Sequence, residues 1–148
     1  KVTKAEILKM ALNTLGKDMS TSGTLKHATA AEHWAKDYVR TAEGMDITLV
    51  SDSNVDLNSA VSRGDVIRLI FEAMDVTPPA VSKTRFSDVT SENENAQYIE
   101  YAAELGVVSG DSDSGGNFTG TFRPNDFINR AEVSKILNNV MALTGSEI

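Results

Sequence analysis

A short pattern that occurs three times constrains the fold of this chain more than any other feature of its sequence. The segments VTKAEILKMALNTL (2–15), VSRGDVIRLIFEAM (61–74) and INRAEVSKILNNVM (128–141) align without gaps. Their columns read apolar, N-cap type, basic, small, acidic and apolar, and a second basic column follows at Lys9, Arg68 and Lys135. The copies lie roughly 60 residues apart, a period that predicts a protein built from repeated units.

Each copy has the features of a helix N-terminus. The residue in the second column has a side-chain oxygen that can accept a backbone hydrogen bond, and the acidic residue three positions later can complete a capping box. Apolar residues then recur at three- and four-residue steps, which predicts a helix with one buried face. The expected N-caps are Thr3, Ser62 and Asn129. The predicted helices begin at Lys4, Arg63 and Arg130.

A second helix is predicted ahead of the motif in the two complete units, because residues 32–47 match 94–108. Both predicted helices end at a residue suited to the left-handed conformation, Asp46 or Gly106. The sequence therefore predicts a mainly α fold of helix–loop–helix units with long loops and little strand. The units are a truncated first one with its linker (1–24), a degenerate second one (25–80) and a complete third one (81–148) with an insertion at 109–120.

Composition excludes several classes of function. The 148 residues carry 21 acidic and 14 basic side chains and a net charge of −7, which argues against nucleic acid or an anionic membrane as partner. The sequence contains no run of 18 uncharged apolar residues, so no membrane-spanning helix is predicted. The absence of cysteine removes disulfides and thiolate metal sites. Since no nucleophile, zinc-protease, phosphate-loop or dinucleotide motif occurs, we expect neither catalysis nor a cofactor.

The basic residues at the start of the three helices indicate an anion. A cation there is disfavoured by about 0.3 to 1 kcal/mol, because it lies at the positive end of the helix dipole. An unfavourable charge that recurs at three helix starts is typical of a functional site, where free N–H groups and a guanidinium bind carboxylate or phosphate. In the alternative interpretation these side chains pair with a carboxylate of a neighbouring unit, such as Asp88, and link the units. Ligand binding and linkage between units are compatible if Asp88 orients the arginine.

The three copies differ as candidate sites. Arg123 lies shortly before Arg130 and would supply a second donor to the same anion, whereas Asp56 at the matching position of the second unit would repel it. Lys4 offers a point charge in place of a guanidinium fork. Trp34 would provide an aromatic platform for a ligand, and its alternative is burial between helices.

The insertion GDSDSGGNF contains oxygen donors that resemble half of a calcium loop, at Asp111, Asp113 and Asn117. It lacks the distant glutamate of such a loop. The alternative is a polar hairpin tip, which the Gly, Asp, Ser and Asn residues favour. We therefore assign no metal ligand.

Residues 85–141 resemble a surface-layer (S-layer) homology repeat. The repeat starts with F-x-D, seen here in RFSD, and continues with a Tyr-Ile helix that ends in glycine, seen in QYIEYAAELG. An F-x-P loop follows in FRP, and the last helix starts with INRAE, which is similar to the I-T-R-A-E of the family. The second unit is a degraded copy, in which Leu25 and His27 replace the Phe and Asp, and Val55 and Leu57 replace F-x-P. The resemblance implies an extracellular module at a bacterial or archaeal cell surface. Its three repeats would pack around a pseudo-threefold axis, with one lobe incomplete because the first unit has only its final helix.

The resemblance also implies a partner, a secondary cell-wall polysaccharide that often ends in ketal-linked pyruvate. The residues expected to bind it are Arg130, Arg123, Arg63, Lys4, Trp34, Asp88 and Gly106. Two alternatives stay open: a module that assembles with other surface proteins after losing its sugar contacts, which the degraded second unit favours, and a calcium-dependent surface domain.

Overall fold

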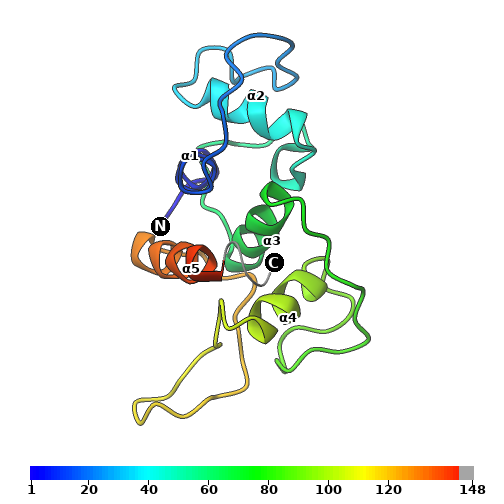
Figure 1. Ribbon diagram of the computed structural model, residues 1–148, viewed down its shortest axis with the longest axis vertical. Coiled ribbons are helices and arrows are strands. Elements are labelled where there is room, and N and C mark those ends of the chain that lie inside the picture. Colours follow the sequence, from blue (N-terminus) through cyan, green and yellow to red (C-terminus); the bar gives the residue numbers. More distant parts are fainter. Residues whose placement is uncertain (144–148) are drawn as a thin grey trace.

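The computed structural model describes residues 1–143, and the mainly helical prediction is confirmed for them (Figure 1). Residues 144–148, which close the predicted third unit, lie outside the described part. Between residues 1 and 143 the backbone forms no strand, only isolated bridges such as Ser112 with Phe118. None of the helices in this range is long and apolar enough to cross a membrane. The helices are α1 (Lys4–Thr14), α2 (Lys36–Gly44), α3 (Arg63–Ala73), α4 (Ala96–Glu104) and α5 (Arg130–Leu143), with a 3-10 turn η1 (Thr48–Val50).

The three motif helices begin where the capping pattern predicts. At α1 the Thr3 hydroxyl accepts the Glu6 N–H at 3.1 Å, and the Glu6 carboxylate accepts the Thr3 N–H at 3.0 Å. Asn129 and Glu132 form the same reciprocal pair at α5, at 2.9 and 3.2 Å. At α3 the Ser62 hydroxyl accepts the N–H of Asp65, while the Asp65 carboxylate accepts a hydrogen bond from the Asn95 amide instead. Two complete boxes and one half box therefore fix the helix starts.

Removing a cap is expected to destabilise the fold. Ser62→Ala or Asn129→Ala should each lower the free energy of unfolding by about 0.5 to 2 kcal/mol, because each leaves a backbone N–H of the first turn without its acceptor. Urea unfolding measures the change. Ser134→Ala, at an exposed position inside α5, is the control and should not destabilise the protein. Equal midpoints for parent and both cap variants would contradict the prediction.

The helices that precede the motif are shorter than predicted. They span Lys36–Gly44 and Ala96–Glu104, because turns such as the one closed by His33 N–H on the Ala30 carbonyl occupy the residues before them. Their ends are confirmed, with φ of 56° at Asp46 and 77° at Gly106. In this left-handed region glycine is the unstrained residue. Each of these helices packs on the motif helix of the preceding unit, α2 on α1 and α4 on α3.

A closed ring of backbone hydrogen bonds joins the three motif segments at the centre of the core. The N–H of Val2 donates to the carbonyl of Ile128 at 3.0 Å, that of Ile128 to Val61 at 3.4 Å, and that of Val61 to Val2 at 2.9 Å. All three side chains are buried. Figure 1 shows α1, α3 and α5 gathered in the middle of the molecule, with α2 above them, α4 below them and the insertion loop extending beyond α4. A near-threefold relation of the motif helices stays a prediction.

The loops before α5 and α3 cover the starts of the preceding motif helices, α3 and α1. At α3, the Arg63 and Gly64 N–H groups donate to the carbonyls of Asp126 and Pro124, each at 2.9 Å. At α1, Lys4 and Ala5 N–H groups donate in the same way to residues 59 and 57. The expectation that free N–H groups at these helix ends bind the anion is therefore wrong for α1 and α3. Loop carbonyls satisfy those donors, so the side chains alone are left to bind a ligand.

Candidate functional site

The basic residue at the start of each motif helix points toward another unit. Arg63 forms an ion pair with Glu132, and Arg130 forms one with Glu6. Lys4 donates to the Ser59 hydroxyl at 2.6 Å. The alternative in which these side chains link the units is thus seen for the two arginines. Their partners are the capping-box glutamates rather than Asp88.

Arg63 and Arg130 are equivalent in sequence but not in burial. The Arg63 side chain is only 10% exposed, its Nε donates to the Phe122 carbonyl at 2.9 Å, and its guanidinium lies 4.9 Å from the Phe122 ring centre. The Arg130 side chain is 63% exposed and contacts Glu6 and the sulfur of Met10. Arg63 is therefore a buried link between units, whereas Arg130 is accessible to a ligand.

A basic groove lies between the end of α4, the insertion and α5, and we call it the α4–α5 groove. Its volume is about 330 Å³. Three cations face two carboxylates there, and the backbone of residues 106–112, including Gly106, forms one wall. The two arginines already contact the two carboxylates, but Lys135 has no hydrogen-bond or ion-pair partner among residues 1–143. The charged residues are Arg63, Arg123, Lys135, Asp111 and Glu132.

Arg123 is held in this groove in a strained conformation. Its φ of 61° lies in the left-handed region, which costs a side-chain-bearing residue about 1 to 2 kcal/mol. Asp88 holds this conformation, because its two carboxylate oxygens accept the N–H groups of Phe122 at 2.9 Å and Arg123 at 2.8 Å. Asp88 therefore positions the loop backbone and does not contact an arginine side chain. Strain that the surroundings maintain in this way is typical of functional positions.

The charges around Arg123 are fixed at neutral pH. Burial raises the pKa of Asp111, but hydrogen bonds from the Arg123 guanidinium and the Thr121 hydroxyl outweigh it, so the pKa lies below its ordinary value. The same hydrogen bond from Asp111, opposed by burial, raises the pKa of Arg123. The Arg123 side chain remains 48% exposed. Its Nε and one terminal nitrogen contact Asp111, and the other terminal nitrogen donates to Asp126 at 3.3 Å, so an incoming carboxylate would share or displace these contacts.

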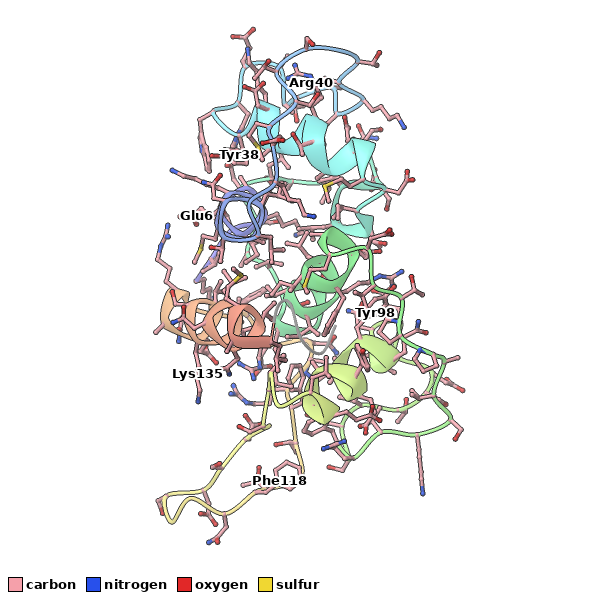
Figure 2. The ribbon with its side chains drawn as sticks, viewed as in Figure 1. Glu6, Tyr38, Arg40, Tyr98, Phe118 and Lys135 are labelled. Atoms are coloured by element: carbon pink, nitrogen blue, oxygen red, sulfur yellow. The ribbon has the colours of Figure 1, made fainter. Side chains whose placement is uncertain are left out.

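A second groove of about 510 Å³ lies between α1 and α5, and we call it the α1–α5 groove. Trp34 lines it and is 57% exposed, with the Lys9 ammonium 5.8 Å from its ring centre. The alternative of Trp34 buried between helices is therefore not realised. Figure 2 shows Glu6, which lines this groove, and Lys135, which lines the α4–α5 groove, on opposite sides of α5. The charged residues that line the α1–α5 groove are Glu6, Lys9 and Arg130.

Arg123 and Arg130 do not share a ligand site, although the sequence analysis expects them to converge. The loop that carries Arg123 packs on α3 and places it beside Arg63, whereas Arg130 points the other way, toward α1. Two residues only seven positions apart along the chain thus line different grooves. Sequence reasoning also omitted Lys135 from the site, although the second basic column of the repeat marks its position.

A third groove, the α2–α3 groove, is the counterpart of the α4–α5 groove in the second unit. The repeat alignment places Lys4, Asp65 and Arg68 at the positions of Arg63, Glu132 and Lys135. Its volume is about 200 Å³. Two cations face three carboxylates, because Glu72 and Glu94 also line it. The balance of charge is therefore reversed with respect to the α4–α5 groove.

The calcium-loop candidates have other partners within the insertion. Asp111 contacts Arg123, and the Asp113 carboxylate accepts the N–H groups of Gly115 and Asn117, each at 2.9 Å. These bonds form a polar hairpin tip. Up to residue 143, the structure contains no group of three or more His, Cys, Asp or Glu side chains placed to hold a metal ion.

Comparison with known proteins confirms the resemblance for the third unit, because the family model of the S-layer homology domain matches residues 85–134. Three relatives share 28 to 29% identity with 71 to 78% of this chain. The chain spans only 5 to 10% of their length. They are an amylopullulanase of Thermoanaerobacterium thermosulfurigenes (29% identity; 71% of this chain, 5% of that protein), the exoglucanase XynX of Acetivibrio thermocellus (28%; 78% and 10%) and an endo-1,4-beta-xylanase A of Thermoanaerobacterium saccharolyticum (29%; 77% and 10%).

Proposed function

We propose that this chain, which carries an S-layer homology domain at residues 85–134, is a non-covalent anchoring module that binds an anionic secondary cell-wall polysaccharide. It would hold a larger protein at the outside of the cell. The relatives support this proposal, since they are named as enzymes and the match covers a tenth or less of each, as expected of an accessory module. No catalytic role is proposed for the matched region.

The α4–α5 groove is the observation that carries the proposal. Arg123 presents a half-exposed guanidinium that a ligand carboxylate would share with Asp111 and Asp126, and Lys135 adds a charge without a partner in the described part of the chain. A groove of about 330 Å³ is of the size that holds a small ligand, such as one sugar with its acidic substituent. A ketal-linked pyruvate would supply that carboxylate. Arg63 and Asp88 hold the site in shape.

The α1–α5 groove would provide a further contact for the polymer. Arg130 is exposed there, and Trp34 offers a flat aromatic face of the kind that packs against a sugar ring. The ring of hydrogen bonds through Val2, Val61 and Ile128 supports the further proposal that the units are arranged around a pseudo-threefold axis. In such an arrangement the grooves are repeated copies of one site.

Binding to isolated cell walls tests the anchoring proposal. Arg123→Ala is expected to weaken binding about 10- to 100-fold, since a hydrogen bond to a charged group contributes about 1.5 to 3 kcal/mol. Arg123→Lys should restore part of the loss, because it keeps the charge without the fork. Arg85→Ala is a matched control, because Arg85 is similarly exposed (45%) and ion-paired with Glu100 outside the three grooves. Sedimentation with walls at low and physiological salt measures the affinity.

The same assay separates the alternatives. Equal binding of parent, Arg123→Ala and the Arg123→Ala/Lys135→Ala double variant would overturn the proposal. Binding that persists on walls stripped of secondary polysaccharide would instead favour a module that assembles with surface proteins. Loss of binding in EDTA would favour the calcium-dependent domain.

A further inference from the structure

We infer that Glu72 is a built-in carboxylate that occupies the α2–α3 groove and prevents this second copy of the site from binding a ligand. The inference deepens the proposed function and rests on it, because it assumes that the equivalent α4–α5 groove binds a carboxylate. The α2–α3 and α4–α5 grooves occupy equivalent positions in the repeat, and Glu72 is proposed to make them differ in ligand binding.

The Glu72 carboxylate is bound as a ligand carboxylate would be. Its Oε1 accepts the backbone N–H of Thr48 at 3.0 Å, and its Oε2 accepts the Thr48 hydroxyl at 2.6 Å and the Arg68 Nε at 3.3 Å. The Glu72 side chain is only 15% exposed. A backbone donor, a hydroxyl and a guanidinium thus converge on one carboxylate, a set of donors suited to an anion.

The other two copies of the motif have an uncharged residue at this position. Asn13 and Asn139 align with Glu72. The Asn139 amide donates to the Val107 carbonyl at 3.0 Å, so it also links its helix to the segment after the preceding helix. Asn139 makes this link without placing a charge in the groove. The structural role of the position therefore does not require a carboxylate.

The basic residues of the two grooves differ accordingly. Arg68 contacts Glu72, donates to the Glu94 carbonyl at 3.2 Å and lies 5.0 Å from the Tyr98 ring centre. Lys135, its equivalent in the α4–α5 groove, has no hydrogen-bond or ion-pair partner within residues 1–143. Removing the Glu72 charge would leave Lys4 and Arg68 facing Asp65 and Glu94, which removes the negative excess.

Two substitutions test the inference. Glu72→Asn copies the third unit, and Glu72→Gln keeps the side-chain length and an oxygen for the Thr48 N–H while removing the charge. The probe is a methyl glycoside that carries ketal-linked pyruvate, titrated into ¹⁵N-labelled protein and followed by NMR. In the parent, the probe should shift the Arg123 Nε–H signal and leave those of Thr48 N–H and Arg68 Nε–H in place. In both variants it should also shift Thr48 and Arg68, with affinity at that groove raised at least tenfold.

Glu92→Gln is the control, because it removes one exposed charge outside the grooves and should behave as the parent does. Dispersed spectra of each variant without probe show that it is folded. Thr48 and Arg68 signals that do not move in either variant, or that already move equally in the parent, would overturn the inference. The proposed function is contradicted separately if the probe does not shift the Arg123 Nε–H signal of the parent. Thr48 and Arg68 report on the second groove in either case.

Discussion

Arg63→Ala is expected to lower the free energy of unfolding by about 3 kcal/mol, because it removes a buried guanidinium and leaves the Phe122 carbonyl and the partly buried Glu132 carboxylate without their donor. Its side chain is 10% exposed and holds Glu132, the Phe122 carbonyl and the Phe122 ring together. In a chain of this size such a loss corresponds to a fall in melting temperature of about 6 °C or more. Differential scanning calorimetry and urea unfolding measure the two quantities.

Arg130→Ala is the matched comparison, since it removes the same residue from the same position of another copy. The Arg130 side chain is 63% exposed, and an exposed ion pair contributes about 0 to 1 kcal/mol. Its removal also relieves an unfavourable charge at the helix start. Stability should therefore change little, while contact with the polysaccharide is weakened. Equal losses of stability in the two variants would contradict the distinction between a buried link and an exposed contact.

Phe122→Ala is expected to cost about 3 to 5 kcal/mol of stability, the usual loss when a buried phenylalanine is truncated. The Phe122 ring is fully buried, and its centre lies 5.4 Å from that of Phe86 and 4.9 Å from the Arg63 guanidinium. The substitution opens a cavity under the loop that carries Arg123. Guanidinium unfolding measures the loss of stability, and wall binding should fall with it because Arg123 is no longer held in place.

Phe118→Ala provides the control for this experiment. Phe118 contacts the same Phe86 ring, with centres 5.9 Å apart, but it is 53% exposed on the hairpin that extends from the molecule in Figure 2. We expect a change of about 0.5 kcal/mol or less, as for most exposed positions. A loss as large as that of Phe122→Ala would mean that the hairpin belongs to the core.

The sequence predicts local structure well because capping is local. Thr3, Ser62 and Asn129 each bind a backbone N–H within their own first turn, so the starts of α1, α3 and α5 follow from a few neighbouring residues. The left-handed ends at Asp46 and Gly106 are predictable for the same reason. The start of α2 is less so, because its N-cap position is Ala35, which makes no side-chain cap.

The candidate site is less predictable because its residues come from different units. Arg123 lies near Arg130 in sequence but lines a groove with Arg63, which is far away along the chain. The pairing of Arg63 with Glu132 follows from how one unit packs on the next, and the repeat pattern alone does not specify that packing. The same packing supplies the loop carbonyls that take the N–H groups of the helix starts.

The ring through Val2, Val61 and Ile128 also affects how the chain acquires its structure. The ring unites segments from the two extremes of the described chain and from its middle, so no unit can complete its own backbone hydrogen bonding before residue 128 has been synthesised. Contacts between such distant residues slow folding, since much of the chain must be ordered before they form. The units are therefore expected to gain stability together, once residue 128 is available, and to lose it in one cooperative step rather than one repeat at a time.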